Sequence, residues 1–379
     1  MSSATDTAPV KERLFTVANQ YFEGLLTDIA HAQKSIDMEV YIFAEDAIGQ
    51  RLISALCAAA ERGVSVRLLV DGAGSPWTIT ALLQQLRKAG GEARVYHPMP
   101  WRFWQWALAA NRYALPLRLM HFFSWVNRRN HRKVTMIDHR IAWLGSLNIT
   151  ADHLALDEGG KGWRDTALRV QSKNCVELKR AFLQAWQHPS VKPSRAKKPV
   201  SGQFMLNYSR YLRRMQHKRV LRHIGRSKQR IWVTNAYFMP DAKLLRGLRY
   251  AAKRGVDVRL MLPAHSDIFF MPWASSHFYR ELLEDGVRIF EYQTGMLHAK
   301  TLLIDHWGTV GSSNLNQRSL RHDLEVDAVL TCKDNVETLS KHFQNDLKHA
   351  KEVGRGGYIK LALWKRLIGR VALLLRYWM

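Results

Sequence analysis

The sequence H-x-K-x4-D followed by G-S-x-N occurs once in each half of the chain, at residues 131–148 and again at residues 298–314. Because an internal repeat predicts repeated structural units, the chain is expected to fold as two matching halves. A motif present in both halves further indicates that the two copies build one active site together. The motif residues are His131, Lys133, Asp138, Ser146 and Asn148 in the first copy and His298, Lys300, Asp305, Ser312 and Asn314 in the second.

A wider repeat surrounds the motif and predicts the class of fold. Residues 59–70, AAERGVSVRLLV, return as residues 251–262, AAKRGVDVRLML. Gly63 and Gly255 stand where a glycine often ends a helix just before the next strand. The alternation of strand and helix in each half predicts an α/β fold of two layers with mixed sheets. The runs predicted as buried strands are residues 35–43 and 230–237.

Composition along the chain predicts how it is divided. Between its glycine and its histidine, the first half is longer than the second by about 25 residues, an aromatic insertion around residues 100–127. A stretch rich in proline, serine and basic residues is typical of a linker, or of a surface loop between domains that stay face to face, which we favour. The predicted segments are residues 1–188 with the first motif, 189–204 as the linker, 205–350 with the second motif, and 351–379 as a basic amphipathic tail.

The motif residues suit attack on a phosphodiester. Residues two apart on an extended strand point to the same face, so each histidine should project beside its lysine. Phosphoryl transfer depends mainly on positioning and on stabilising charge at the non-bridging oxygens. One imidazole can attack phosphorus while the other protonates the leaving oxygen, and two lysines can supply the positive charge. We therefore expect neither a metal nor an organic cofactor.

The remaining motif residues are expected to support this chemistry. A single H-x-K carries little weight, because His and Lys are common on solvated strands, but two full motifs within a wider repeat argue against coincidence. Asp138 and Asp305 belong to the signature and stand near expected turns, which Asx side chains stabilise, so they should support the site rather than touch phosphate. The residues expected to complete a ring of phosphate donors are Ser146, Asn148, Ser312 and Asn314.

The net charge predicts an anionic partner. The chain has 57 Lys and Arg against 32 Asp and Glu, a formal charge of +25 and a pI near 10.2. Nucleic acid and an anionic membrane both fit such a surface. Single-stranded nucleic acid stacks on a few spaced aromatics, whereas residues 101–127 and 357–379 mix dense Trp, Phe and Leu with arginine and contain no acid. Phospholipid is the expected partner, and nucleic acid the alternative.

The tail is expected to lie in the membrane interface as an amphipathic helix. On a helix, Leu361, Trp364, Ile368, Val371 and Leu375 recur at three- and four-residue steps. Charges interrupt every apolar run before the ~18–20 residues that a span needs. The alternative is a helix packed on the body of the protein. The predicted membrane-binding residues are Trp101, Trp104, Trp106, Trp364, Lys365, Arg366 and Trp378.

Cysteine usage and the N-terminus predict the compartment. Cys57, Cys175 and Cys332 show no C-x-x-C spacing, which indicates neither a zinc site nor a disulfide set and suits a reducing environment. Residues 1–11 are short and polar and do not resemble a signal peptide. We therefore expect a peripheral protein on the cytoplasmic face of the bacterial inner membrane.

At these residues the chain resembles the phospholipase D superfamily, and within it the bacterial cardiolipin synthases that lack N-terminal transmembrane helices. The resemblance runs from about Arg13 to Ala350. It implies two α/β/α sandwich domains related by a pseudo-twofold axis, with the active site at their interface. The phrases that carry the closer match are EVYIF at residues 39–43, DGAGS at 71–75, NAYF at 235–238 and GSSNL at 311–315.

The resemblance also implies a mechanism with a phosphohistidine intermediate. By order in the chain and family practice, His131 is expected to be the nucleophile and His298 the general acid and base. The family places an acidic residue on a later strand to orient each histidine, and we expect Asp165 to orient His131 and Glu325 to orient His298. Alternatively, both acids form surface pairs at strand edges. His121 and His153 could line an entrance, but each is interpreted as a core or solvated histidine.

The function expected from the resemblance is transfer of a phosphatidyl group to phosphatidylglycerol, which gives cardiolipin. The motifs do not identify the donor or the acceptor, because a phospholipase D that uses water, or a phosphatidylserine synthase, carries the same catalytic residues. The alternative from another class is a metal-independent nuclease on the same scaffold. Exclusion of water by lipid at the mouth of the site would favour transfer over hydrolysis.

Overall fold

The computed structural model describes residues 11–110, 127–187, 202–354 and 363–374 of the chain, and these form two sheets flanked by helices. The first sheet has the order β1-β7-β6-β5-β2-β3-β4 and the second the order β15-β11-β10-β9-β12-β13-β14-β8. The first comprises β1 Lys11–Phe15, β2 Ser35–Val40, β3 Ser65–Asp71, β4 Glu92–Tyr96, β5 Val134–Ile137, β6 Ile141–Gly145 and β7 Ala167–Gln171. The second comprises β8 Phe204–Leu206, β9 Arg230–Thr234, β10 Asp257–Pro263, β11 Arg288–Tyr292, β12 Thr301–Ile304, β13 Trp307–Gly311, β14 Val326–Val329 and β15 Ala350–Glu352.

Both sheets are mixed, as the sequence predicts. In the first, β2, β3 and β4 run parallel while β5, β6, β7 and β1 pair antiparallel, and the second repeats this with β9, β10 and β11 followed by β12, β13 and β14. The predicted strands at 35–43 and 230–237 are confirmed as β2 and β9, although both end earlier. Gly63 and Gly255 have φ of 87° and 84°, in the left-handed region that a helix-ending glycine adopts.

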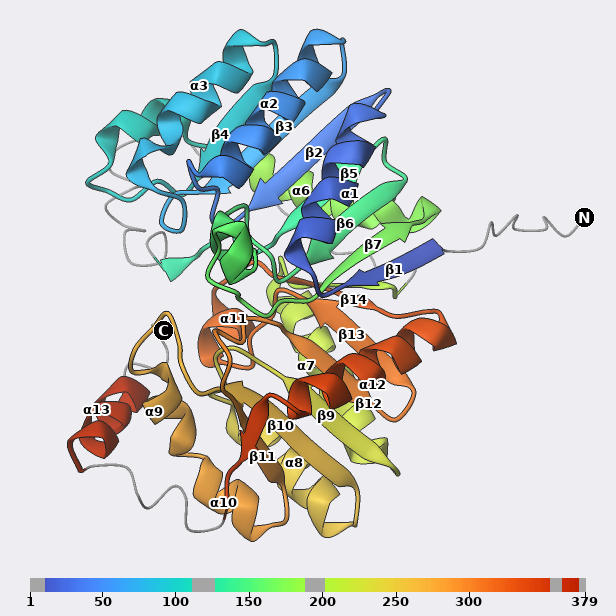
Figure 1. The fold of residues 1–379 in the computed structure, drawn as a ribbon, viewed down its shortest axis with the longest axis vertical. Helices are drawn as coiled ribbons and strands as arrows, with labels where there is room; N and C mark the ends of the chain where they lie inside the picture. Colours follow the sequence, from blue (N-terminus) through green and yellow to red (C-terminus); the bar gives the residue numbers. More distant parts are fainter. Residues whose placement is uncertain (1–10, 111–126, 188–201, 355–362, 375–379) are drawn as a thin grey trace, which may run out of the picture.

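The helices are stacked in layers around the two sheets (Figure 1). One apolar core joins α1, α2 and α3 to the outer face of the first sheet, and another joins α7, α8 and α10 to the outer face of the second. The main helices are α1 Ala18–Ala30, α2 Ala47–Glu61, α3 Thr80–Lys88, α6 Val176–Trp186, α7 Arg210–Arg226, α8 Ala242–Lys253, α9 Met271–Ser276, α10 Tyr279–Glu284, α11 Gln317–Arg321, α12 Lys333–Leu347 and α13 Leu363–Leu374.

The inner faces of the two sheets share one core. Leu144 of β6 and Leu168 of β7 belong to the same buried cluster as Val310 of β13 and Val326 of β14, together with residues of α6 and α12. Burial of this apolar surface holds the halves together, because each Å² of apolar area removed from water contributes about 25 cal/mol. The shared core agrees with two domains that stay face to face.

The structure refines the predicted segments. Most of the 189–204 linker lies outside the described residues, and its last residue, Phe204, begins β8. Residues 351 and 352 lie in β15, so this sheet extends into the predicted tail. Within the insertion around residues 100–127, residues 103–108 form a short 3-10 helix, and residues 111–126 lie outside the described part. The division into domains remains a prediction.

Candidate active site

The two H-x-K runs meet where the halves touch. Each run is extended and lies just ahead of its strand, β5 or β12, rather than in the strand as predicted. The backbone N–H of His131 donates to the carbonyl of Leu324 (3.0 Å), and that of His298 donates to the carbonyl of Arg164 (2.8 Å). These bonds form part of two parallel β-bridges, one for each motif, and both bridges join one half to the other. Backbone pairing between the halves therefore positions both histidines.

The acid that holds each histidine comes from the opposite half, so the predicted pairing is wrong. His131 Nδ1 lies 3.0 Å from Glu325 Oε1, and His298 Nδ1 lies 2.7 Å from Asp165 Oδ1. The reason is the backbone bridges, which place the residue after Leu324 beside His131 and the residue after Arg164 beside His298. An ionised carboxylate only accepts, so each Nδ1 carries the proton and each Nε2 keeps a free lone pair.

Two serine hydroxyls support Glu325. Ser312 Oγ donates to Glu325 Oε2 (2.5 Å), and Ser319 Oγ donates to Glu325 Oε1 (2.7 Å). Burial raises the pKa of Glu325, while the Lys133 charge and these hydroxyls oppose the rise. Ser146 Oγ donates instead to the Thr166 carbonyl (3.2 Å). A hydroxyl has one proton to donate, so neither motif serine is the phosphate donor that the sequence predicted.

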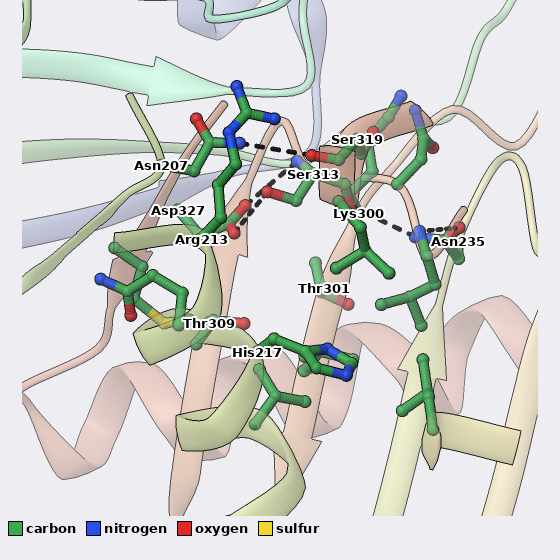
Figure 2. Close-up of a pocket in the computed structure, with 18 residues that line it drawn as sticks. Asn207, Arg213, His217, Asn235, Lys300, Thr301, Thr309, Ser313, Ser319 and Asp327 are labelled. Atoms are coloured by element: carbon green, nitrogen blue, oxygen red, sulfur yellow. Dashed lines mark hydrogen bonds between the residues drawn. The ribbon is translucent and has the colours of Figure 1, made fainter. Parts of the chain in front are cut away.

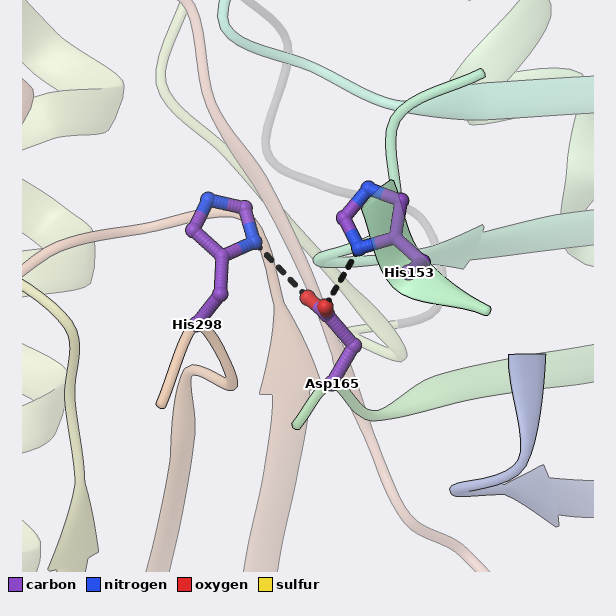
Figure 3. A group of neighbouring side chains, drawn as sticks. All are labelled: His153, Asp165 and His298. Atoms are coloured by element: carbon purple, nitrogen blue, oxygen red, sulfur yellow. Dashed lines mark hydrogen bonds and ion pairs between the residues drawn. The ribbon is translucent and has the colours of Figure 1, made fainter. Parts of the chain in front are cut away.

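A third histidine supports Asp165, and sequence reasoning missed it (Figure 3). His153 Nδ1 lies 2.6 Å from Asp165 Oδ2, and its Nε2 accepts the backbone N–H of Asn148 at 3.0 Å. Because Nε2 accepts, the proton of the neutral ring is on Nδ1 and points at the carboxylate. Burial alone raises the pKa of Asp165, but His153 and His298 hold it well below its usual value. No periodic or repeat signal in the sequence identifies His153, because it stands in a 3-10 turn, Ala151–His153.

The same three side chains are a candidate metal site. One ligand atom from each of His153, Asp165 and His298 lies within 4.8 Å of the others, and all three residues are buried. Both imidazoles already place Nδ1 within hydrogen-bond distance of the carboxylate. The geometry is therefore complete as a hydrogen-bonded triad that positions His298.

The two motif lysines are buried and strongly perturbed. Lys133 Nζ donates to the carbonyl of His131 (2.8 Å), and Lys300 Nζ donates to the carbonyl of His298 (2.5 Å). Burial, followed by repulsion from Lys300, lowers the pKa of Lys133 to about 7. Burial lowers the pKa of Lys300 to about 8. Each ammonium has three donors and would be stabilised by an anion, so the pair forms a site prepared for phosphate.

The two motif asparagines occupy different environments. Asn148 Oδ1 accepts the backbone N–H of Ile42 at 3.3 Å and thereby joins its loop to the segment after β2. Asn314 is also buried, but its Oδ1 has no hydrogen-bond partner within the described part of the chain. Because Oδ1 is an acceptor, this unused atom cannot itself donate to phosphate, and a donor role for Asn314 would fall to its amide N–H groups.

The motif aspartates lie at the other end of the strands and stabilise turns. Asp138 accepts the backbone N–H groups of Gln33, Lys34 and Ser35 at 2.7–3.0 Å, and Asp305 accepts three equivalent N–H groups at 2.9–3.0 Å. Both have φ of 51°. Seven residues of extended chain separate each from its histidine, a distance of about 20 Å. They are structural, as the turn argument indicates, and do not belong among the catalytic residues.

Replacing Asp138 by alanine is expected to lower stability by about 2–3 kcal/mol, because three backbone N–H groups lose a charged acceptor. Although burial opposes it, these donors hold the pKa of Asp138 below its usual value, so the stabilisation is present near neutral pH and fades as pH falls through that pKa. Thermal unfolding at pH 7 and pH 3 measures the effect, with exposed Asp157→Ala as control. Loss of turnover with unchanged thermal stability would instead indicate that Asp138 has a catalytic role.

The predicted membrane-binding residues are only partly described. Trp101 and Trp104 are 62% and 43% exposed, and Trp106 is half-buried. Trp364 lies on α13 and is 55% exposed. Lys365 and Arg366 also belong to α13, but their side chains are not described, and Trp378 lies outside the described residues. None of the described helices is long and apolar enough to cross a bilayer.

The fold and the site together define a class: two similar α/β halves that bring two His-Lys pairs to one interface, as expected of a phosphodiester-transferring enzyme. The family described as cardiolipin synthase, phospholipase D-like domain, matches residues 25–186 and 220–347. The chain belongs to this family, which confirms the resemblance seen in the sequence.

Comparison with known proteins gives relatives by sequence and relatives by fold. Cardiolipin synthase 1 of Bacillus anthracis is 30% identical over 94% of this chain and 70% of its own length, and a cardiolipin synthase of Listeria welshimeri is 31% identical over 96% and 74%. Among solved structures, phosphatidylserine synthase of Haemophilus influenzae has a TM-score of 0.69 at 11% identity, covering 97% of this chain and 95% of that one. Polyphosphate kinase of Porphyromonas gingivalis has a TM-score of 0.57 at 14% identity, over 89% and 50%. The solved structures show the fold alone.

Proposed function

We propose that the protein is a phosphatidyltransferase that makes cardiolipin from phosphatidylglycerol, with a second phospholipid or a second phosphatidylglycerol as partner. The observation that carries the proposal is the crossed arrangement of the site. Each histidine is buried beside a buried lysine and has its Nδ1 held by an acid from the other half. Relatives named as cardiolipin synthases that match over nearly the whole chain support the choice of lipid.

The reaction proceeds in two steps, formation of a phosphohistidine and its attack by the incoming hydroxyl. His131 Nε2 attacks phosphorus, the bond to the leaving alcohol breaks, and that oxygen takes a proton from His298. The hydroxyl of the incoming phosphatidylglycerol then gives its proton to His298 and attacks phosphorus, and the P–N bond breaks. Lys133 and Lys300 stabilise the charge on the non-bridging oxygens throughout.

An asymmetry between the acids supports these roles for the histidines. Asp165 stays ionised because two imidazoles depress its pKa, and a fixed anion stabilises the imidazolium that a general acid must form. Burial raises the pKa of Glu325, which suits a partner that orients a neutral nucleophile. Burial and neighbouring lysine charge lower the pKa of both His131 and His298, so each Nε2 is unprotonated until a phosphate anion enters.

An exposed aromatic patch supports attachment to an anionic membrane surface, which we propose to be the cytoplasmic face of the bacterial inner membrane. Phe269, 67% exposed, contacts Trp273 of α9 with ring centroids 5.8 Å apart, and Trp273 contacts Trp364 of α13 at 5.2 Å. Gly369 permits this packing, because a Cβ there would lie 2.7 Å from the Trp273 carbonyl oxygen. The helix α13 therefore packs on α9 (Figure 1), and its Trp364 remains exposed. Aromatic and basic residues on one helix suit an anionic interface.

Replacing Phe269 and Trp364 together by serine is expected to weaken binding to vesicles that contain phosphatidylglycerol by about tenfold or more, because two exposed rings no longer enter the interface. Vesicle flotation at low and high salt measures the loss. The matched control is Tyr250→Ser, since Tyr250 is an aromatic residue of α8 that is 63% exposed. Equal binding by the double variant and the control would remove this patch from the docking surface.

The proposed activity is tested by lipid mass spectrometry in the presence of EDTA. Purified protein with phosphatidylglycerol, alone and with phosphatidylethanolamine, should form cardiolipin, and the His131→Ala variant should not. Phosphatidic acid as the main product would instead indicate a phospholipase D, and phosphatidylserine formed on addition of serine would indicate the synthase of that lipid. Cleavage of DNA in EDTA without lipid turnover would overturn the proposal in favour of a nuclease.

A further inference from the structure

We propose that a cavity beside Lys300 binds the glycerol headgroup that enters or leaves in the transfer reaction, an inference that rests on the proposed function. The cavity of about 80 Å³ lies between α7 and the outer face of the second sheet. One water needs at least about 10–15 Å³ of such space, so the cavity has room for several waters or one three-carbon polyol. Figure 2 shows its lining side chains converging from α7 and the strands.

The cavity adjoins the reacting groups. Lys300 forms part of its wall, and Lys300 Nζ donates to the carbonyl of His298. Ser319 is also in the wall, and its hydroxyl donates to Glu325, the acid that holds His131. The wall thus contacts His298 directly and reaches His131 through Glu325, which is the position expected of a site for the group bonded to phosphorus.

At the equivalent place in the first half, which carries the same motif, a large side chain occupies the position. Strand register aligns Trp143 of β6 with Thr309 of β13, since they pair with the second residues of β5 and β12 respectively. Trp143 is fully buried against Phe15 and Tyr21 and fills the position. Thr309 leaves it open. The two halves thus differ in the space beside the motif lysine. This difference assigns the headgroup to the second half, beside Lys300.

The side chains at this place are also more polar in the second half than in the first. Leu147 and Ala167 of the first half correspond to Ser313 and Asp327 of the second, where the Ser313 hydroxyl donates to Asp327 (2.6 Å). Asp327 is half-buried, and a cavity used only for packing would gain nothing from its carboxylate, because polar groups cost free energy in an apolar interior.

The wall carries charged groups of both signs. Lys300 and Arg213 are the basic residues among its lining side chains, and Asp327 is the acidic one. Lys300 and Arg213 disfavour an ammonium headgroup, while Asp327 disfavours a free anion. Neighbouring hydroxyls that both donate and accept can pair with the basic donors and with the carboxylate, so a neutral polyol is the ligand class that fits.

Filling the cavity is the test. Thr309→Met from the sheet and Val220→Phe from α7 reduce its volume, and Val287→Met, in the outer core away from the cavity, controls for altered packing. The substrate is a short-chain phosphatidyl p-nitrophenyl ester with added glycerol or ethanolamine. Attack by a glycerol oxygen forms a P–O bond, breaks the P–N bond to the histidine and passes one proton to His298, giving phosphatidylglycerol, whereas water gives phosphatidic acid.

In the wild-type protein and Val287→Met, the ratio of glycerol ester to phosphatidic acid should saturate as the glycerol concentration rises. It should also exceed the ratio of ethanolamine ester to phosphatidic acid that is measured with added ethanolamine. Thr309→Met and Val220→Phe should lower the glycerol ratio about tenfold, with p-nitrophenol release within about twofold of wild type. Unchanged ratios in both filled variants, or a wild-type preference for ethanolamine, would overturn the assignment. The protein could make no cardiolipin while its glycerol ratio saturates in the wild type and not in the filled variants. That result would uphold the cavity assignment and reject the proposed function.

Discussion

Asp165→Asn and Glu325→Gln are each expected to lower cardiolipin formation by about 10³–10⁴-fold with the fold intact, because the amide leaves one histidine in the wrong tautomer or orientation. In Asp165→Asn the affected residue is His298, since the two groups are 2.7 Å apart. In Glu325→Gln it is His131, 3.0 Å away. Single-turnover lipid assays measure both losses, and Asp152→Asn, a neighbouring acid that pairs with Lys161 at the surface, is the control.

An activated leaving group separates the two variants. p-Nitrophenol leaves without a proton, so a phosphatidyl p-nitrophenyl ester does not need the general acid in the first step. Quench-flow measurement should show the first turnover of Asp165→Asn restored to within about tenfold of wild type, while Glu325→Gln stays inactive. The opposite pattern would make His298 the nucleophile. Equal failure of both variants would contradict any division of labour between the acids.

Lys133→Met is expected to lower turnover by about 10²–10³-fold and to raise thermal stability. The activity falls because one of two charges that stabilise the phosphoryl oxygens is removed. The stability rises because burial, with repulsion from Lys300, lowers the pKa of Lys133 from 10.5 to about 7. A shift of this size costs the folded protein on the order of 3–5 kcal/mol at neutral pH, and methionine fills the space without that cost.

The sign of the pH dependence follows from the same shift. Between about pH 7 and pH 10.5 the unfolded chain binds more protons at this lysine than the folded protein does, so wild-type stability rises with pH across that range. The stability advantage of Lys133→Met should therefore be largest at or below pH 7 and shrink as pH increases. Differential scanning calorimetry from pH 6 to 9 measures it, with Lys133→Arg as the charged control. A lower melting temperature for Lys133→Met at pH 6 would contradict the argument.

The sequence by itself determined the duplicated architecture and the set of reacting groups. Strands such as β9 were predicted correctly because their apolar runs reflect burial on both faces, a local property of the chain. Gly63 and Gly255 ended their helices as expected, because only glycine adopts the left-handed conformation without strain. His131 and His298, each with its lysine, followed from the repeat.

Only the tertiary structure decided which groups serve each histidine. The pairing of His131 with Glu325 and of His298 with Asp165 depends on backbone bridges between segments more than 100 residues apart, which leave no trace in local spacing. The role of His153 did not follow from the sequence either, because its contact with Asp165 depends on how the chain folds back after the 3-10 turn Ala151–His153. Side-chain chemistry and periodicity are local properties that can be identified from the sequence. Contacts across the interface are long-range and form only when the two halves pack together.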